Sequence, residues 1–421
     1  MNHDTLRQVI LDQHEIIRRA EIVPRTYVFE KQANYILTGL RRAGKSTMLY
    51  SIVRELIAGG VGWERIIYIN FEDERLAEFS LTDFNDILAV QSEMSQEKGF
   101  YFFDEIQVVP GWEKFCRRLA DAKEHVWITG SNAKMLSREM EATLGGRYLS
   151  SRIDPYSFEE YLTAGEIPHG VNELLATKPR GRIVTACRAY MTDGGLPESL
   201  AFTSKREYLS NVFQKILLGD IVSRNKIRND YAVRMLIKKL AETVKDEVSY
   251  SKLHGTLKGI GVSISKDSLI DYLNCAMDAY LVFPVLNGYA KFSERESTPK
   301  YYFADNGILN LFLVQKEGIL LENMIAVALY RRYGDGLRYL KSSRTGLDID
   351  FWLPEEGTAI QVCDRLDDQN REREIGNLVR LSQKQADVRR RILVTWGSDH
   401  AIRTDEGVEI EVQSPERFLL G

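Results

Sequence analysis

The first 150 residues alternate two kinds of hydrophobic pattern. Short runs of β-branched and aromatic residues, typical of buried strands, alternate with helix-length stretches that carry apolar residues on one face. This alternation is typical of an α/β domain in which helices cover a parallel sheet. It predicts strands at Tyr35–Thr38, Arg65–Phe71, Phe100–Phe103, Val126–Thr129 and Tyr148–Ile153, and helices at Lys45–Ala58, Leu81–Glu93, Trp112–Asp121 and Ala133–Glu141.

The pattern changes at Asp154–Pro155. From there to about Leu200 it predicts helices joined by Gly and Pro loops, which we interpret as a helical lid. A helical, basic segment follows from Lys205 to Leu240. Two further helical stretches and two strands are typical of a helix-turn-helix followed by the hairpin of a winged helix. These elements are Val248–Ile260, Lys266–Leu281, Phe283–Tyr289 and Tyr301–Ala304.

The remainder predicts a third region of α/β type. It begins with a helix from Asp305 through Leu329. Strands follow at Leu337–Lys341, Asp348–Leu353, Ala359–Cys363 and Arg391–Trp396, with a helix at Arg371–Ala386. We therefore divide the chain into three domains, at residues 1–200, 201–304 and 305–421.

Composition and charge exclude several classes of protein. Hydrophobic residues make up 44% of the chain and charged residues 28%, which is typical of a globular protein and excludes a disordered or fibrous chain. The net charge of −4 excludes a chain-wide nucleic-acid coat, so any DNA contact must be local. Residues 205–240 carry a local net charge of +6, with nine basic and three acidic residues. Such a run is usually a solvated helix face.

Four scattered cysteines, Cys116, Cys187, Cys275 and Cys363, show neither zinc-site nor disulfide-framework spacing. A reducing compartment fits this usage. The N-terminus lacks the apolar core of a signal peptide, and no apolar run reaches the length of a membrane span. We therefore expect a cytoplasmic protein without a membrane partner.

A phosphate-binding loop is the strongest motif. Gly39, Leu40, Arg41, Arg42, Ala43, Gly44, Lys45 and Ser46 form an unbroken G-x-x-x-x-G-K-[ST] between a predicted strand and a predicted helix, and Thr47 follows. Glycines let backbone N–H groups approach the phosphates, while Lys45 reaches the β- and γ-phosphates and Ser46 binds Mg²⁺. The motif predicts a nucleotide site with ATP and Mg²⁺ as ligands. ATP is favoured over GTP by default, because no Asn-Lys-x-Asp guanine signature occurs.

An apolar strand ends in two adjacent carboxylates, Asp104 and Glu105, about 60 residues after this loop. Strand ends in an open α/β sheet face the ligand crevice. We therefore assign Asp104 to Mg²⁺ and Glu105 to the attacking water, as in a Walker B motif. The pair indicates hydrolysis as well as binding.

Two further positions are weaker candidates for the same site. Ser131, with Asn132 second, follows a buried strand where a γ-phosphate sensor would lie, although either residue could simply cap the next helix. Arg147 lies in a Gly-Gly-Arg turn, from which it would stabilise transferred-phosphate charge in cis or across a homo-oligomer interface. A surface arginine is the alternative, and Arg41 and Arg42 are other cationic candidates.

Together these motifs resemble a family of microbial AAA-type P-loop ATPases whose C-terminal region is known only as a domain of unknown function. The resemblance rests on Leu37–Ser46, Phe103–Gln107 with Trp112, Thr129–Asn132, Leu144–Arg147 and Pro155–Tyr161. It implies an ATPase core with strand order 5-1-4-3-2, a winged helix and a C-terminal domain resembling restriction endonucleases.

The endonuclease-like domain departs from the pattern that a working site requires. Asp350 and Glu322 match an Asp and a preceding helical Glu, but Gln361 and Cys363 stand where Glu and Lys are required. The lost charges weaken both Mg²⁺ binding and transition-state stabilisation. We predict an inactive domain whose acids belong to a retained scaffold.

These observations favour an Mg²⁺-dependent ATPase that acts as a switch or motor on a macromolecular partner. The alternatives are an ATP-dependent nucleic-acid-binding or processing protein and a binding module without turnover. Residues 251–292 carry a net charge of only +1, and acids lie on the predicted recognition helix. We therefore favour a protein partner over DNA.

Overall fold

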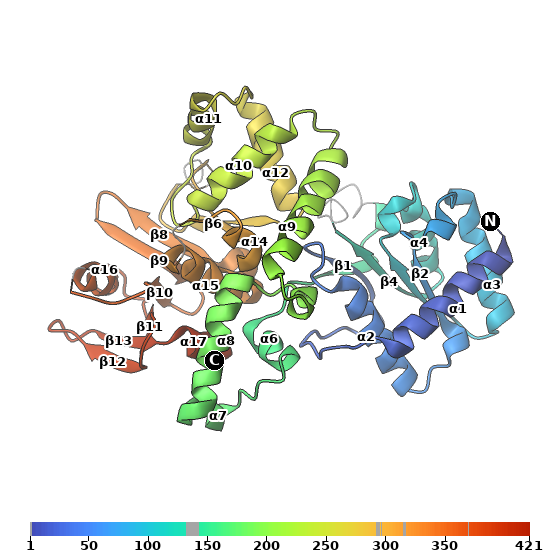
Figure 1. Ribbon diagram of the computed structural model, residues 1–421, viewed down its shortest axis with the longest axis horizontal. Helices are drawn as coiled ribbons and strands as arrows, with labels where there is room; N and C mark the ends of the chain where they lie inside the picture. Colours follow the sequence, from blue (N-terminus) through green and yellow to red (C-terminus); the bar gives the residue numbers. More distant parts are fainter. Residues whose placement is uncertain (1, 132–142, 292–294, 296, 315–316, 369) are drawn as a thin grey trace. The chain divides into compact units, whose positions relative to one another are not determined.

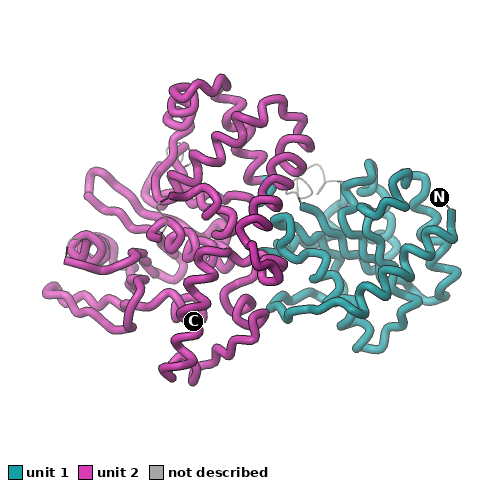
Figure 2. The backbone as a smooth tube through the Cα atoms, in the orientation of Figure 1, with its two compact units in different colours: residues 1–154, 278–280 teal, residues 155–277, 281–421 magenta. Residues whose placement is uncertain are grey.

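The computed structural model describes residues 2–131, 143–291, 295, 297–314, 317–368 and 370–421. The chain forms two compact units (Figure 2). Unit 1 contains residues 1–154 and 278–280, and unit 2 contains residues 155–277 and 281–421. Our domain boundaries at 200/201 and 304/305 stay predictions.

Unit 1 is built on a five-stranded sheet in which every neighbouring pair is parallel. The strand order is β2-β3-β4-β1-β5, which confirms the expected 5-1-4-3-2 order (Figure 1). β4 lies between β1 and β3, so the ends of these three strands meet at one edge. The strands are β1 (Asn34–Thr38), β2 (Ile66–Asn70), β3 (Phe100–Asp104), β4 (His125–Gly130) and β5 (Tyr148–Arg152).

Helices cover both faces of this sheet. One core joins α1, α3 and α4 to the sheet, and a second core joins α2 to the opposite face. These helices are α1 (His3–Arg19), α2 (Lys45–Ala58), α3 (Phe84–Met94) and α4 (Trp112–Asp121). The sequence analysis predicted α2, α3 and α4 but missed α1, whose Leu6, Val9 and Ile10 are fully buried. The predicted helix at residues 133–141 lies outside the described residues.

Unit 2 opens with the helices expected after Asp154 and continues through the basic segment. The helices are α6 (Phe158–Ala164), α7 (Val171–Leu175), α8 (Thr177–Asp193), α9 (Lys205–Lys215), a π-helix (Ile216–Ser223), α10 (Asp230–Glu242), α11 (Tyr250–Gly259) and α12 (Lys266–Asp278). Two antiparallel strands then follow, as the sequence predicts. The winged-helix assignment stays a prediction, because the first of these strands also pairs with the larger sheet of unit 2.

That sheet has eight strands in the order β12-β13-β11-β10-β9-β8-β6-β7 and mixes parallel with antiparallel pairs. Its strands are β6 (Val282–Asn287), β7 (Lys300–Phe303), β8 (Arg338–Ser342), β9 (Leu347–Leu353), β10 (Thr358–Val362), β11 (Arg390–Val394), β12 (His400–Arg403) and β13 (Glu409–Gln413). The helix α16 (Arg371–Lys384) packs on β9 and β10. The sequence analysis did not predict β12, β13 or the last helix, α17 (Pro415–Leu420).

One predicted helix was wrong. The expected helix from Asp305 through Leu329 is two helices, α14 (Asn306–Asn310) and α15 (Glu317–Tyr333). The side-chain amides of Asn306 and Asn310 donate to the Met191 and Thr192 carbonyls of α8, which holds α14 against that helix. Among the described residues, no helix is both long enough and apolar enough to cross a membrane.

Candidate nucleotide site

The loop from residue 39 to residue 46 joins the end of β1 to the start of α2. Its backbone turns sharply, with positive φ at Gly39 (140°), Arg42 (66°) and Gly44 (96°). A Cβ at position 39 would lie 2.1 Å from the carbonyl oxygen of Ile153, so only glycine fits there. Such a turn exposes backbone N–H groups on its concave side, as a phosphate cradle requires.

Lys45 and Ser46 begin α2. Lys45 is 6% exposed, and its Nζ donates to the carbonyl oxygens of Gly39 and Leu40, each at 3.1 Å. Ser46 and Thr47 are partly exposed in the first turn of the helix, where the backbone N–H groups have no partner within the helix. The ammonium therefore lies inside the loop, and the helix start favours an anion.

Arg25 braces this loop from the N-terminal side, a role that the sequence analysis missed. Its guanidinium donates to the carbonyl oxygen of Ala43 at 3.0 Å and to that of Asp154 at 2.7 Å. The Asp154 N–H in turn donates to the hydroxyl of Tyr27 at 3.1 Å. One side chain thus connects the phosphate loop to the last residue of the main segment of unit 1.

Asp104 lies at the end of β3 and is 2% exposed. The hydroxyl of Tyr68 donates to its Oδ2 at 2.9 Å, and the hydroxyl of Thr129 donates to its Oδ1. Burial, followed by the charge of Asp104, raises the pKa of Tyr68 well above its usual value, so this donor stays protonated. The carboxyl group is therefore fixed by two hydroxyl groups from neighbouring strands.

Glu105 follows in a left-handed conformation, with φ of 52°. Its backbone N–H donates to Thr129 Oγ1 at 2.9 Å, and the Gln107 amide donates to its carboxylate. Burial raises the pKa of Glu105, the charge of Lys45 lowers it, and that of Asp104 raises it again. A carboxylate with a raised pKa is better suited to accept a proton from water.

The sequence analysis did not assign Thr129 or Tyr68 to the site. Thr129 belongs to the segment Thr129–Asn132, which carries part of the family resemblance, but we assigned the sensor role to Ser131 and Asn132 instead. Tyr68 carries no local signal, because its contact depends on the pairing of β2 with β3. Thr129 contacts both members of the acid pair, which makes it the central residue of this arrangement.

The weaker candidates for the site differ in their burial and in their contacts. Ser131 is 1% exposed just beyond β4, whereas Asn132 lies outside the described residues. Arg147 donates to Asp121 and to the Gly145 carbonyl oxygen, the latter at 3.1 Å. A catalytic role for Arg147 therefore requires it to leave this ion pair.

Arg41, another cationic candidate, lies 3.9 Å from a carboxylate oxygen of Glu72. Arg42 is exposed on the loop. The roles of both arginines stay predictions.

Comparison with known proteins identifies two regions. A family described as an AAA domain matches residues 31–162, and a domain of unknown function, DUF8612, matches residues 184–317. The first match contains the whole nucleotide loop and the acid pair.

Two relatives cover most of the chain. The uncharacterized protein MJ1544 of Methanocaldococcus jannaschii is 34% identical over 379 residues, which are 87% of this chain and 83% of the relative. An uncharacterized protein of Haemophilus influenzae is 29% identical over 391 residues, covering 89% and 92% of the two chains. Among solved structures, the Walker-type ATPase PABY2304 of Pyrococcus abyssi is 15% identical with a TM-score of 0.43, covering 70% of this chain and 99% of that one.

Proposed function

The chain belongs to the family of AAA-type P-loop ATPases, and from this premise we propose that unit 1 binds ATP with Mg²⁺ and hydrolyses it. The observation that carries the proposal is the convergence of two strand ends. The phosphate loop follows β1 and the acid pair ends β3, and only β4 separates these strands in the sheet. Lys45, Ser46, Asp104 and Glu105 therefore share the carboxyl edge, where ligands of open α/β sheets bind.

The residues at this edge fit a magnesium ion. Oxygen ligands are what Mg²⁺ prefers, and Ser46 and Asp104 supply a hydroxyl and a carboxylate. Asp104 accepts hydrogen bonds from Tyr68 and Thr129, which orient it as outer-shell partners orient metal ligands. When bound with ATP, Mg²⁺ neutralises charge on the phosphates.

The chain's own residues supply the rest of the chemistry. Lys45 places a positive charge against the β- and γ-phosphates, and the loop N–H groups bind their oxygens. Glu105 orients the attacking water and accepts its proton, while Gln107 and Thr129 hold Glu105 in place. Ser131 remains our candidate for sensing the γ-phosphate.

We further propose that nucleotide state acts as a switch on a macromolecular partner. Arg25 supports this proposal, because it holds the Ala43 carbonyl of the loop and the Asp154 carbonyl at the chain's exit from unit 1. A change in the loop would therefore change the hold on the segment that leads into unit 2. The partner is a macromolecule, with protein favoured over DNA.

Two substitutions test the proposed hydrolysis. Lys45→Ala removes a phosphate-binding cation and should abolish tight ATP binding, whereas Glu105→Gln should keep binding and lose turnover. ATP affinity by equilibrium titration and phosphate release would be measured on both variants. Equal loss of ATP binding in the two variants would contradict the assigned roles.

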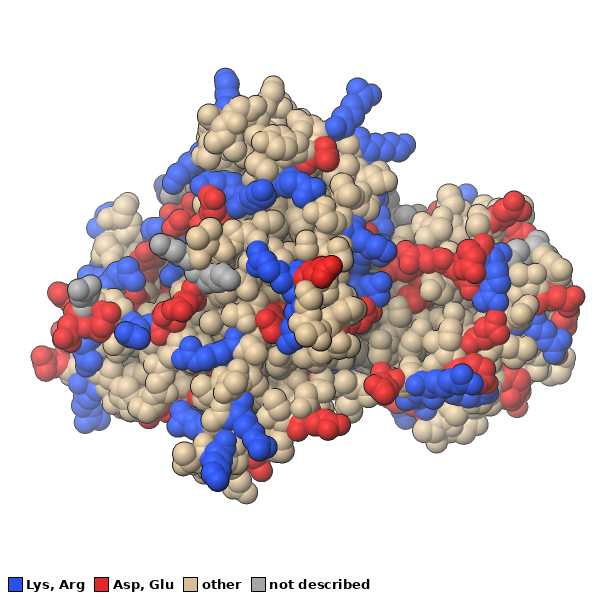
Figure 3. All heavy atoms as spheres, viewed as in Figure 1, with Lys and Arg blue, Asp and Glu red and all other residues tan. Residues whose placement is uncertain are grey.

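Nucleic-acid binding is the second candidate function. Basic side chains gather over the helices α10 to α12 on the face shown in Figure 3. Two basic residues of segment 205–240 are nevertheless paired with acids of the same unit: Lys205 with Asp193 at 2.8 Å and Arg224 with Asp220 at 3.4 Å. Binding to duplex DNA that weakens steeply with salt would favour this candidate, since phosphate contacts release counterions.

A further inference from the structure

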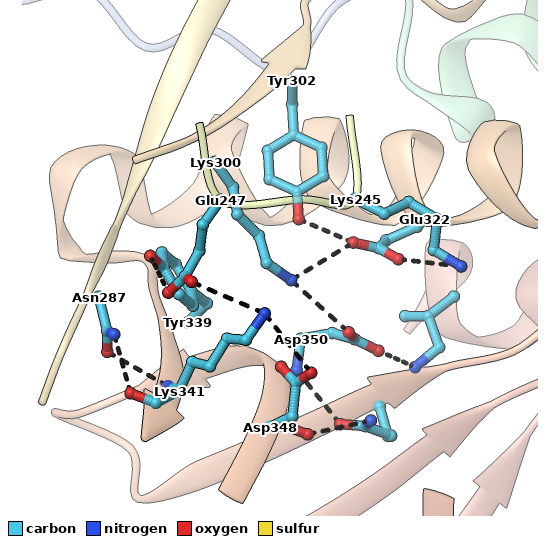
Figure 4. A network of polar contacts seen from close by, with 12 residues as sticks. Lys245, Glu247, Asn287, Lys300, Tyr302, Glu322, Tyr339, Lys341, Asp348 and Asp350 are labelled. Atoms are coloured by element: carbon cyan, nitrogen blue, oxygen red, sulfur yellow. Dashed lines mark hydrogen bonds and ion pairs between the residues drawn. The ribbon is translucent and has the colours of Figure 1, made fainter. Parts of the chain in front are cut away.

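Unit 2 contains a buried group of charges that we call the Lys300 centre, formed by Lys300 of β7, Glu322 of α15, Asp350 of β9 and Glu374 of α16. Figure 4 shows the first three of these residues. Lys300 Nζ lies 3.9 Å from Glu322 Oε1 and 3.8 Å from Asp350 Oδ1. The Lys300 side chain is 3% exposed and that of Glu322 is 1% exposed. The ammonium therefore lies between two carboxylates inside the protein.

Another element places a charge beside one of the two positions where the expected charge is missing. Gln361 Nε2 donates to Glu374 Oε2 at 2.8 Å, so a carboxylate from α16 stands beside the uncharged glutamine. The positive charge of Lys300 comes from another strand and lies 3.8 Å from Asp350 Oδ1. Asp350 keeps a fixed orientation, because Val362 N–H donates to its Oδ2 at 2.9 Å.

The charge of Lys300 opposes the effect of burial on the pKa of Asp350. Burial raises the pKa of Asp350, Glu322 raises it further, and Lys300 lowers it. Burial lowers the pKa of Lys300, but the charges of the surrounding acids together raise it above its usual value, so Lys300 stays charged. These acids are Glu322, Asp350, Asp348 and Glu247. Glu322 Oε2 is buried without a hydrogen-bond partner, and Lys245 Nζ lies 3.5 Å from it. Buried carboxylates of this kind require a positive charge beside them.

We propose that the Lys300 ammonium takes the place of a divalent cation between Glu322 and Asp350, which makes the centre a metal-independent anchor for α15. Among the described residues, no group of three or more His, Cys, Asp or Glu side chains is arranged to hold a metal ion. Because the ammonium is a fixed part of the chain, it offsets the negative charge of Glu322 and Asp350 at any concentration of metal ions.

The anchor holds α15 through consecutive residues. Tyr302 of β7 donates its hydroxyl to Glu322 Oε1 at 2.9 Å. The next residue of α15, Asn323, accepts from Phe303 N–H at 2.8 Å and donates to the Phe303 carbonyl oxygen at 2.9 Å. Together with the Lys300 charge, these bonds fix the helix on the edge strand.

Mn²⁺ binding to the full chain without nucleotide tests the proposal independently of ATP hydrolysis. The wild type should show no Mn²⁺ site in this centre. Lys300→Met should gain one site, at least tenfold tighter than any wild-type binding, and adding Asp350→Asn should remove it again. Lys341→Met is the matched control, because Lys341 belongs to the same network but pairs with Glu247 and Asp348. It should behave as the wild type.

Two results would overturn the proposal. One is folded Lys300→Met protein that gains no Mn²⁺ site. The other is wild-type protein that binds Mn²⁺, or nicks plasmid DNA in Mn²⁺, with the effect lost in Asp350→Asn. This second arm needs no lysine variant, so it decides the question even where Lys300→Met fails to fold.

Discussion

Replacing Thr129 by valine tests the arrangement of the acid pair most directly. Thr129 is fully buried at the end of β4, and valine has nearly the same shape. The change removes the hydrogen bond that the hydroxyl donates to Asp104 and the one that it accepts from the Glu105 N–H. The volume of the core stays the same, so the effect reports on these two bonds.

The magnitude follows from the two bonds. A hydrogen bond to a charged group contributes about 1.5–3 kcal/mol, and an N–H group left without a partner costs about 1–3 kcal/mol. Because Glu105 is only partly buried, we take a value near the lower end of the sum of these two contributions. Unit 1 should therefore lose about 3 kcal/mol of stability. For a domain of this size that is a fall in Tm of about 6–12 °C.

Turnover should fall by more than binding. Losing an outer-shell partner of a metal ligand costs about 10–100-fold in activity. The left-handed backbone of Glu105 also loses the bond that anchors its N–H group, so the water-orienting carboxylate is no longer fixed. Phosphate release under saturating ATP and thermal unfolding are the assays. Thr129→Ser keeps the hydroxyl and serves as the control. Turnover of Thr129→Val within twofold of the wild type, or equal damage in both variants, would refute the reasoning.

Three further predictions concern other parts of the chain. Burial raises the pKa of Asp305 to about 6, against backbone N–H groups that lower it. As the pH falls, the Asp305 carboxylate therefore binds a proton in the folded protein before it does so in the unfolded chain. Between pH 7 and pH 5 the wild type should gain about 1.4 kcal/mol of stability relative to Asp305→Asn in denaturant unfolding. Arg331→Ala breaks a partly buried two-bond pair with Glu160 and should cost unit 2 about 1.5–3 kcal/mol. The exposed neighbour Arg332→Ala should cost under about 0.5 kcal/mol in the same measurement. Arg25→Met releases the phosphate loop and should weaken ATP binding about tenfold in an equilibrium titration, which corresponds to a loss of about 1.4 kcal/mol.

The sequence predicts the elements of unit 1 well because their signals are local. The helices Lys45–Ala58 and Trp112–Asp121 have the predicted bounds, and each follows a glycine in the left-handed conformation, Gly44 or Gly111. Such glycines mark where a helix can begin after a sharp turn. The missed helix α1 also carries a helical spacing of apolar residues, but no chemical motif lies beside it.

The candidate site likewise combines residues that the sequence identifies with residues that only the fold brings together. The phosphate loop and the acid pair are continuous motifs, so the sequence identifies them directly. The contacts of Thr129 and Tyr68 with Asp104 depend on which strands are neighbours and in what register, and the pairing of Asn70 with Asp104 is visible only in the fold. Lys300 comes 50 positions before Asp350 and from a different strand, so no spacing rule connects the two residues.

Buried polar bonds give unit 2 a property that an apolar core would not provide. Hydrogen bonds are directional, so a helix held by them has one register on its sheet, whereas apolar contacts tolerate small shifts. α15 is held in this way at Glu322 and Asn323, and about 13 Å further along the helix Arg331 grips the carbonyl of Pro155 and the carboxylate of Glu160. The segment that follows unit 1 is therefore attached to a helix whose other end cannot slip. A displacement of that segment must then move α15 together with β7, or first break the bonds between Arg331 and Glu160.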